Sequence, residues 1–593
     1  MQSAVDLPGS FASQSKQASQ HDAQKKDQQT PEPVKLTPIQ EETIKSIQEK
    51  TSKPGFSTIL RLVASAESQD QADQLLGHLT SAFTQFSAPQ ANSFKIIKAK
   101  PKHKAVHRIS KRKLLYHFIF RIFHEKHAFI LNTEEIASIF HFPIYSTKTP
   151  KLKLLKSIQA PSPANMPQTG LILGKNNFRG QKTLVRLTKE DRRRHLYVIG
   201  QTGTGKSSQI KELVRQDIES GHGIGVIDPH GELIDDILGY VPANRAEDVI
   251  LFNPSDLERP IGLNMLEYDP AKPEQKTFIV NELINIFDKL YDLKTTGGPM
   301  FEQYTRNALL LLMDDPNEPV TLMEVPKVLA DADYRKRLLA KCKDPIVRNF
   351  WEKEAEKAGG DAALANMVPY ITSKFNIFIA NDYMRPIIGQ VKTGLKFREI
   401  MDSKKILLIN LSKGKLGDIN SSLLGLIIVS KIMIAAFARA DTPTEQRSDF
   451  YFYLDEFQNF TTPSIATILS EARKYHLNLI IAHQFIGQLQ EEIKKAVFGN
   501  VGNLITMRVG AEDAEFLVKQ YEPVFTQNDL VNIDNFNSFV KLQIAGATTE
   551  AFSMEHVKPK ESNIEMADKI RELARLKFGK AREQVKEEIR GRS

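Results

Sequence analysis

The stretch from His195 to Ser208, HLYVIGQTGTGKSS, constrains this chain more than any other. It begins with a short apolar run and continues as Gly-x-x-x-x-Gly-Lys-Ser, the pattern of a loop that cradles phosphate groups. Its glycines let the backbone approach the phosphates, and its amides form an anion-binding nest ahead of a helix. Apolar residues at helical spacing follow from Ile210 to Ile218. The sequence therefore predicts a strand, a nucleotide-binding loop and a helix.

Two side chains of this loop have distinct expected roles. We expect Lys206 to reach the β- and γ-phosphates of a nucleotide and the Ser207 hydroxyl to coordinate Mg²⁺. The loop amides and the helix N-terminus would hold the remaining phosphate charge. The predicted nucleotide-binding residues are Gly200, Gln201, Thr202, Gly203, Thr204, Gly205, Lys206, Ser207 and Ser208.

Length and composition set the frame for this loop. A chain of 593 residues is too long for one core, so several domains are expected, and its net charge of +9 suggests an anionic partner. The only cysteine is Cys342, which excludes an intrachain disulfide and a cysteine-rich zinc site. The most apolar stretch, residues 423–440, is broken by Lys431 and Arg439 and predicts a buried helix. We therefore expect no transmembrane segment, no secretory signal and a cytoplasmic protein that reaches a membrane only through a partner.

The order of apolar runs and helical patterns predicts an α/β fold with a mostly parallel sheet. A small N-terminal α/β domain is expected from strands at 58–64 and 94–97 around a helix at 72–86, and an all-helical insertion from the patterns at 271–400. The predicted organisation is a disordered tail at 1–40, the N-terminal domain at 41–145, a linker at 146–170, the P-loop domain at 171–270 and 401–557 around the insertion at 271–400, and a charged helical tail at 558–593.

A basic segment at residues 95–113 contains lysines and arginines and no acid, and an aromatic run follows at 116–123. One interpretation is a surface that contacts the phosphate backbone of a nucleic acid. The other is a solvated basic loop in front of a core helix. The composition does not decide between the two.

Two further strand ends carry groups suited to nucleotide hydrolysis. Asp455 ends a buried strand, where a carboxylate can hold the water shell of Mg²⁺, and Glu456 beside it can orient or deprotonate the attacking water. Gln484 follows the next strand and can bond water and a γ-phosphate together. Because the carboxyl ends of parallel strands share one edge of a sheet, we expect these groups to lie beside the P-loop.

Two arginines are candidates for stabilising the transition state. A guanidinium suits the charge on a phosphoryl group in transfer, and a neighbouring subunit often supplies it. Arg473 lies on the helix between the strands that end at Asp455 and Gln484, whereas Arg508 ends a later strand. Surface or salt-bridge roles are the alternative for both arginines.

Together these motifs resemble the HerA/FtsK superfamily of ring-forming, DNA-pumping ATPases, and within it the TraG/TraD-type coupling proteins of conjugative type IV secretion. The resemblance covers residues 170–557 and implies a RecA-like P-loop NTPase core with an all-helical insertion. The segments that carry it are GQTGTGKS at 200–207, VIDPHGEL at 226–233, FYLDEFQNF at 452–460, ARKYHLNLIIAHQ at 472–484 and NVGNLITMRVGAEDA at 500–514.

The resemblance implies a Walker A role for Lys206 and Ser207, a Walker B role for Asp455 and Glu456, a sensor at Gln484 and an arginine finger at Arg473. It also implies ATP and Mg²⁺ as ligands, a hexamer with ATP between subunits, a central channel for DNA, and membrane components of a type IV secretion system as partners. The strand type of the DNA stays open. Two alternatives remain: a secretion-assembly ATPase acting on protein, which the N-terminal α/β unit weakly resembles, and an ATP-gated scaffold that docks substrates without turnover.

Overall fold

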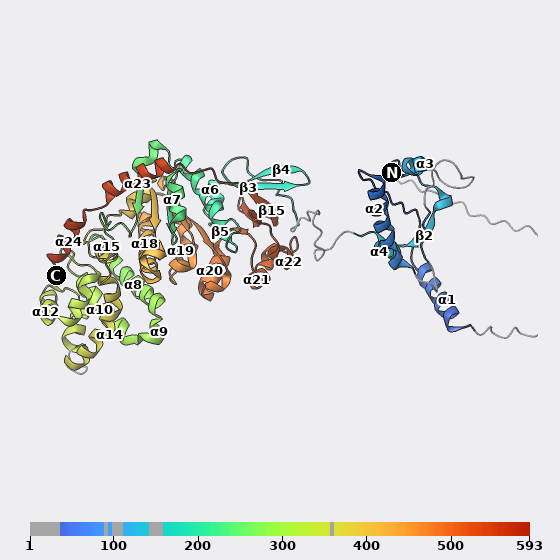
Figure 1. Cartoon of the computed structure of the whole chain (residues 1–593). Coiled ribbons are helices and arrows are strands. Elements are labelled where there is room, and N and C mark those ends of the chain that lie inside the picture. Colours follow the sequence, from blue (N-terminus) through green and yellow to red (C-terminus); the bar gives the residue numbers. More distant parts are fainter. Residues whose placement is uncertain (1–35, 88–92, 98–110, 142–157, 356–360, 593) are drawn as a thin grey trace, which may run out of the picture. The chain divides into compact units, whose positions relative to one another are not determined.

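The computed structural model of the protein describes residues 36–87, 93–97, 111–141, 158–355 and 361–592. The chain divides into two compact units, Met1–Pro150 and Lys151–Ser593 (Figure 1). Most of the predicted disordered tail, much of the basic segment at 95–113 and much of the predicted linker lie outside the described residues.

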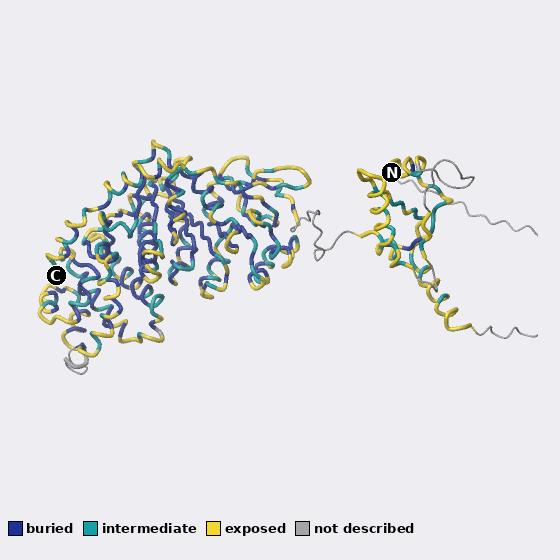
Figure 2. Tube along the Cα trace, viewed as in Figure 1, coloured by how far each residue is buried: buried dark blue, intermediate teal, exposed yellow. Residues whose placement is uncertain are grey.

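The first unit has little buried apolar surface. Helices α1 (Pro38–Thr51), α2 (Gln69–Ala82) and α4 (Thr133–Ile139) contain no buried residue, and most of this unit is exposed or intermediate in Figure 2. Its short sheet pairs β1 (Gly55–Thr58) antiparallel with β2 (Phe129–Asn132), and α3 (Lys111–Ile119) lies between them in sequence.

The strands predicted at 58–64 and 94–97 are wrong. The register of the short sheet starts at Gly55 opposite Asn132 and ends at Thr58 opposite Phe129, where β2 begins. Beyond Thr58 this strand has no backbone partner among the described residues, and apolar alternation alone does not satisfy the backbone groups of a strand. The helix predicted at 72–86 is confirmed as α2 followed by a 3₁₀ turn at Phe83–Phe86.

The second unit is built on an 11-stranded sheet with the order β4-β3-β15-β12-β11-β5-β10-β9-β6-β8-β7. Neighbours from β11 to β7 run parallel and those from β12 to β4 antiparallel, which confirms the predicted mostly parallel α/β fold. The strands are β3 (Leu171–Phe178), β4 (Gln181–Leu187), β5 (Leu196–Ile199), β6 (Gly223–Asp228), β7 (Val249–Phe252), β8 (Ile406–Asn410), β9 (Phe450–Leu454), β10 (Leu477–His483), β11 (Asn503–Thr506), β12 (Asn537–Lys541) and β15 (Phe552–His556). A separate two-stranded ribbon joins β13 (Gln543–Ile544) to β14 (Ala547–Thr548).

Four adjacent parallel strands bring the candidate site residues to one edge of the sheet. In the register of this sheet Ile199 pairs with His483, and Leu454 pairs with both Ile481 and Ile227. The ends of β5, β10, β9 and β6 are therefore side by side. We call the residues that follow these strands the carboxyl edge and the residues that precede them the amino edge.

Helices cover the sheet and fill the interval between β7 and β8, where the described residues contain no strand. The sheet is covered by α6 (Lys206–Glu219), α7 (Glu232–Leu238), α18 (Asp418–Phe437), α19 (Ile465–Glu471), α20 (Glu491–Asn500), α21 (Ala511–Tyr521) and α22 (Gln527–Val531) (Figure 1). The interval between β7 and β8 holds α8 (Gln275–Tyr291), α9 (Leu293–Thr296), α10 (Gly298–Leu312), α11 (Val325–Ala330), α12 (Ala332–Lys341), α13 (Pro345–Asn349), α14 (Asp361–Ile379), α15 (Arg385–Ile388) and α16 (Phe397–Asp402).

The most apolar helix, α18, lies in the core, as the sequence predicts. The stretch Asp418–Asp441 is long enough to cross a membrane, and its most apolar 18-residue window has a mean hydropathy of 2.1, but 78% of that window is buried inside the protein. Lys431 within it donates to the carbonyl of Glu267 at 2.7 Å. Burial of this kind is typical of a core helix. Its two cations, Lys431 and Arg439, both have partners inside the protein.

The C-terminal segment is helical, as predicted, but it is not a free tail. Its helices α23 (Ile564–Phe578) and α24 (Arg582–Arg590) pack on the second unit, with Ala567 and Ile570 buried and Arg575 paired to Asp256 at 2.6 Å. The charged composition predicts a helical extension at the surface, and the narrow apolar stripe on one face packs it against the second unit.

Candidate active site

The phosphate-binding loop follows β5 and leads into α6. Gly205 caps α6 with a φ of 115°, and a Cβ there would lie 2.9 Å from the ring of Phe536, so two separate constraints require glycine. The amide of Phe536 donates to the carbonyl of Thr204, and the amide of Gln201 donates to the carbonyl of Arg508, both at 2.9 Å. The loop is thus held in place by the segments that follow β11 and precede β12.

Lys206 is folded into its own loop. Its Nζ donates to the carbonyl of Gly200 at 2.6 Å and to that of Gln201 at 3.4 Å, and the residue is only 7% exposed. Burial lowers the pKa of Lys206, and the charges of Glu456 and Asp455 oppose that shift. A phosphate bound in this loop would replace the two carbonyls as the partner of the ammonium group.

Three buried carboxylates meet at the carboxyl edge. Asp455, Glu456 and Asp228 are 5%, 7% and 1% exposed. Burial raises the pKa of Asp455 to about 6, with further contributions from the charges of Glu456 and Asp228, while Lys206 acts in the opposite direction. Asp228 ends β6 and accepts the amides of His230 at 2.7 Å and Leu233 at 2.9 Å, so it also caps α7. Sequence reasoning did not select Asp228 as a site residue, although its place at the end of a buried strand was visible.

This excess of acid over base fits a divalent cation. A doubly charged ion would offset the repulsion that raises the Asp455 pKa. Ser207 is exposed on the first turn of α6, and hydroxyl and carboxylate oxygens are the ligand types that Mg²⁺ prefers. Ser207 and Asp455 are therefore the residues that would hold the metal.

A chain of hydrogen bonds joins the P-loop to Glu456. The Thr202 hydroxyl donates to Oε1 of Gln484 at 3.2 Å, and Nε2 of Gln484 donates to Oε1 of Glu456 at 2.8 Å. The second carboxylate oxygen, Oε2, accepts Nε2 of Gln458 at 2.7 Å. Gln484 therefore links the loop to the carboxylate. Gln458 was missed by sequence reasoning, because only the folded turn brings its amide back to Glu456.

The two candidate arginines lie at opposite edges of the sheet. Arg508 is at the carboxyl edge, and its guanidinium donates to Oδ1 of Asn535 at 2.8 Å and to the carbonyl of Ile533 at 3.4 Å. Arg473 is exposed in the 3₁₀ turn η9 (Ala472–Tyr475), which precedes β10 at the amino edge. At about 3.3 Å per residue, β10 alone spans about 20 Å. Arg473 is therefore out of reach of the P-loop of its own chain.

The chain is similar to several solved structures. The unbound bacterial conjugative coupling protein TrwBΔN70 has a TM-score of 0.47 and 15% identity, with 64% of this chain and 88% of that chain covered. The plasmid coupling protein TrwB in complex with ADP and Mg²⁺ has a TM-score of 0.47 and 14% identity, with 65% and 90% covered. VirB4 of Thermoanaerobacter pseudethanolicus has a TM-score of 0.47 and 17% identity, with 68% and 99% covered. No curated protein matches the chain.

Three segments of the chain match models of known protein families. Residues 9–154 match a domain of unknown function, DUF8128. Residues 173–414, which contain the P-loop and Asp228, match the central domain of helicase HerA. Residues 449–519, which contain Asp455, Glu456, Arg473 and Gln484, match the TraM recognition site of TraD and TraG. Residues 173–414 are therefore of the HerA type and residues 449–519 of the TraG/TraD type, so the chain is similar to HerA/FtsK-type conjugative coupling proteins.

Proposed function

We propose that the chain is an ATP-hydrolysing, ring-forming DNA translocase of the conjugative coupling type. The observation that supports this most strongly is the division of the hydrolytic groups between the two edges of one sheet. The carboxyl edge carries Lys206, Asp455, Glu456 and Gln484, whereas the exposed Arg473 lies at the amino edge. A site that needs both sets is formed by two copies of the chain, and repeated head-to-tail contacts of this kind form a ring when the rotation between copies closes.

The residues suggest a division of labour during hydrolysis. The loop amides and Lys206 bind the phosphates, and Glu456 orients the attacking water and accepts its proton. Gln484 links Glu456 to Thr202 and so couples the carboxylate to the occupied loop. Arg473 of the neighbouring copy stabilises the charge that develops on the γ-phosphoryl group. Ser207 and Asp455 would hold Mg²⁺, which would supply positive charge to the phosphate oxygens.

The proposed substrate is DNA. The chain carries a net charge of +9, and cationic surfaces bind the phosphate backbone by releasing its counterions. The match of residues 449–519 to the TraM recognition site of TraD and TraG supports protein partners that belong to a DNA-transfer machinery. We also infer a RecA-like core at 171–270 and 401–557 around a helical insertion at 271–400, which the run of helices from α8 to α16 supports.

The test is ATP hydrolysis by the purified full-length protein with and without DNA. We expect DNA to stimulate the activity, Glu456→Gln to lower it by at least about 100-fold, and the rate to rise more than linearly with protein concentration. A strictly linear rate down to dilute monomer contradicts the shared site, and full activity of Glu456→Gln contradicts the assignment of that residue. Absence of DNA binding at low salt favours the secretion-assembly ATPase acting on protein. Absence of phosphate release at any concentration favours the ATP-gated scaffold.

A further inference from the structure

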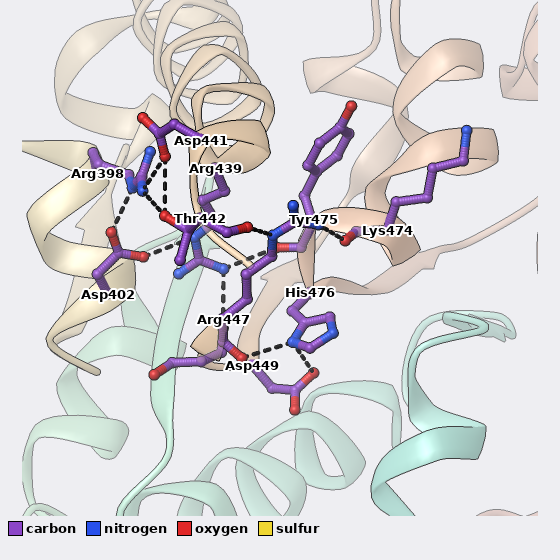
Figure 3. A network of polar contacts seen from close by, with 11 residues as sticks. Arg398, Asp402, Arg439, Asp441, Thr442, Arg447, Asp449, Lys474, Tyr475 and His476 are labelled. Carbon is purple, nitrogen blue, oxygen red and sulfur yellow. Dashed lines mark hydrogen bonds and ion pairs between the residues drawn. The ribbon is translucent and has the colours of Figure 1, made fainter. Parts of the chain in front are cut away.

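The turn that presents Arg473 is held by two guanidinium groups from outside the turn. Nη1 of Arg447 donates to the carbonyl of Lys474, and Nη1 of Arg439 donates to the carbonyl of Tyr475 at 2.9 Å (Figure 3). These are the two carbonyls that follow Arg473 in the chain. The backbone on the carboxyl side of Arg473 is therefore fixed at two consecutive positions.

Both guanidinium groups are themselves anchored. Arg439 is 0% exposed, donates to the carbonyl of Ser448 at 2.9 Å and pairs with Asp402 at 2.9 Å. Arg447 donates from Nε to the carbonyl of Thr442 at 2.9 Å and lies over the ring of Tyr475, 5.5 Å from its centroid. Each arginine thus connects the turn to the segment between α18 and β9.

The exit of the turn is constrained as well. His476 has a φ of 56°, a conformation that is uncommon for residues other than glycine and needs support from its surroundings. Its Nδ1 lies 2.7 Å from the carbonyl of Arg447. Next to it, Asp449 is paired to Arg193 at 2.9 Å and to Lys189 at 3.0 Å. Together these contacts fix the backbone conformation of the residues that lead into β10.

The side chain of Arg473 contrasts with this fixed backbone. It is exposed, and no hydrogen bond or ion pair to its guanidinium occurs within the described residues. A rigid backbone with a free guanidinium is the arrangement expected of a group that acts on another molecule, because the fixed turn limits the positions that the side chain can sample.

We propose that Arg447 and Arg439 are positioning residues, which fix the turn η9 so that Arg473 meets the γ-phosphoryl group bound by a neighbouring copy of the chain. This inference rests on the proposed role of Arg473 in the shared site. A displacement of about 1 Å in such a group costs about 100-fold in rate.

Arg447 is the residue to change, because Arg439 is fully buried and its loss threatens folding. We expect Arg447→Ala to lower kcat about 10- to 100-fold with little change in KM for ATP, since the P-loop of the same chain is untouched. Arg447→Lys should be intermediate, because one ammonium cannot hold both carbonyls in the same geometry. The matched control is Arg398→Ala: Arg398 pairs with Asp402 and Asp441 in the same network but does not contact the turn, and its loss should change kcat less than about twofold.

Mixing of full-length variants separates a positioning role from a general structural one. Glu456→Gln subunits retain Arg473, and Arg473→Ala subunits retain Glu456, so their mixture should regain ATPase activity at the interfaces that combine the two intact halves. Arg447→Ala mixed with Glu456→Gln should regain activity in the same way. Arg447→Ala mixed with Arg473→Ala should regain none, because both lack a working arginine.

The mixtures assign each failure to one of the two proposals. If Glu456→Gln and Arg473→Ala do not complement each other, the shared site is wrong and the positioning role falls with it. If they do, and Arg447→Ala either fails to complement Glu456→Gln or complements Arg473→Ala, the shared site stands and the positioning role is overturned. An unchanged kcat in Arg447→Ala also overturns it.

Discussion

The two edges of the central sheet use charge in opposite ways. At the carboxyl edge, Asp455, Glu456 and Asp228 lie together against a single lysine, and burial raises the pKa of Asp455 to about 6. At the amino edge the buried acids have dedicated cations: despite their burial, the pKa values of Asp217 and Asp449 are both lowered to about 2 by neighbouring arginines.

The best example of the amino edge is the pair between Arg192 and Asp217. The guanidinium makes two bonds of 2.7 and 2.6 Å to the carboxylate, and the Tyr453 hydroxyl donates to the same carboxylate at 2.5 Å. Arg192 also lies 3.4 Å from the ring centroid of Tyr451. Both charges of this pair are satisfied within the chain, as expected of a structural support.

The two edges of one sheet thus differ in how their buried charges are balanced. The carboxyl edge keeps charges that only a bound cation and phosphates would balance. The amino edge keeps one guanidinium, that of Arg473, exposed above a network of satisfied pairs. Substitution of the groups proposed to act in hydrolysis should cause the largest effects, and substitution of the buried groups that have partners within the chain should cause smaller ones.

Loss of the free arginine should have the largest effect. Arg473→Ala should lower kcat by about 10³-fold or more, the range measured for arginine fingers, while ATP still binds to the P-loop. Steady-state hydrolysis and binding of a fluorescent nucleotide measure the two quantities. If Arg473→Ala keeps more than about a tenth of the wild-type activity, Arg473 and the amino edge do not take part in the active site.

Glu456→Gln should lower kcat by about 10²- to 10⁴-fold, because an amide cannot accept the proton of the attacking water. Nucleotide affinity should be retained, since the change is isosteric. The matched control is Gln458→Ala, which removes only the bond to Oε2 of Glu456 and should cause a smaller loss. Equal losses of kcat in the two variants would mean that hydrolysis depends on the conformation of the turn after β9 and not on the Glu456 carboxylate.

Asp217→Asn should leave Arg192 buried without its counter-charge and lower the free energy of unfolding by about 3–5 kcal/mol. Urea denaturation followed by circular dichroism measures it. The control is Asp236→Asn, which removes the half-exposed pair with Lys211 and should cost about 1 kcal/mol or less. Similar values for both variants would contradict a scaffold built on buried pairs.

The smallest effect concerns His195, which precedes β5 at the amino edge. Its Nδ1 accepts the amide of Leu479 at 3.1 Å, so Nε2 carries the proton and donates to the carbonyl of Leu469 at 3.2 Å. Burial lowers the pKa of His195 to about 4. The unfolded chain binds this proton near pH 6.5 and the folded chain only near pH 4, so stability falls as the pH drops through that window, by up to about 3 kcal/mol.

His195→Gln removes this titration and should flatten the fall in the free energy of unfolding between pH 6.5 and 4. Urea titrations at several pH values in that window measure the change. His230→Gln, at an exposed histidine of the same unit, should leave the fall unchanged. An identical pH profile for wild type and His195→Gln would show that His195 does not contribute to acid sensitivity.

Local sequence patterns were enough to predict several parts of this protein. The P-loop, its strand and its helix follow from residues close together in sequence, and so does the burial of α18. The convergence of Asp455, Glu456 and Gln484 on the P-loop could be anticipated, because parallel strands bring their carboxyl ends to one edge. The catalytic roles of these residues stay predictions that the variants above test.

Other features depended on contacts between distant parts of the chain. The pairing of β1 with β2, the Gln458–Glu456 bond and the packing of α23 have no local signal. The order of the strands, with β5 between β10 and β11, was decided by packing. Because β10 runs parallel to β5, Arg473, which precedes β10, lies at the opposite edge from Lys206, which follows β5. The clamps from Arg447 and Arg439 on the turn likewise exist only in the folded chain. Sequence by itself determined which groups are present and which strands they end, because spacing is local; only the tertiary structure decided which charges are paired and which stay free, because pairing depends on distance in space.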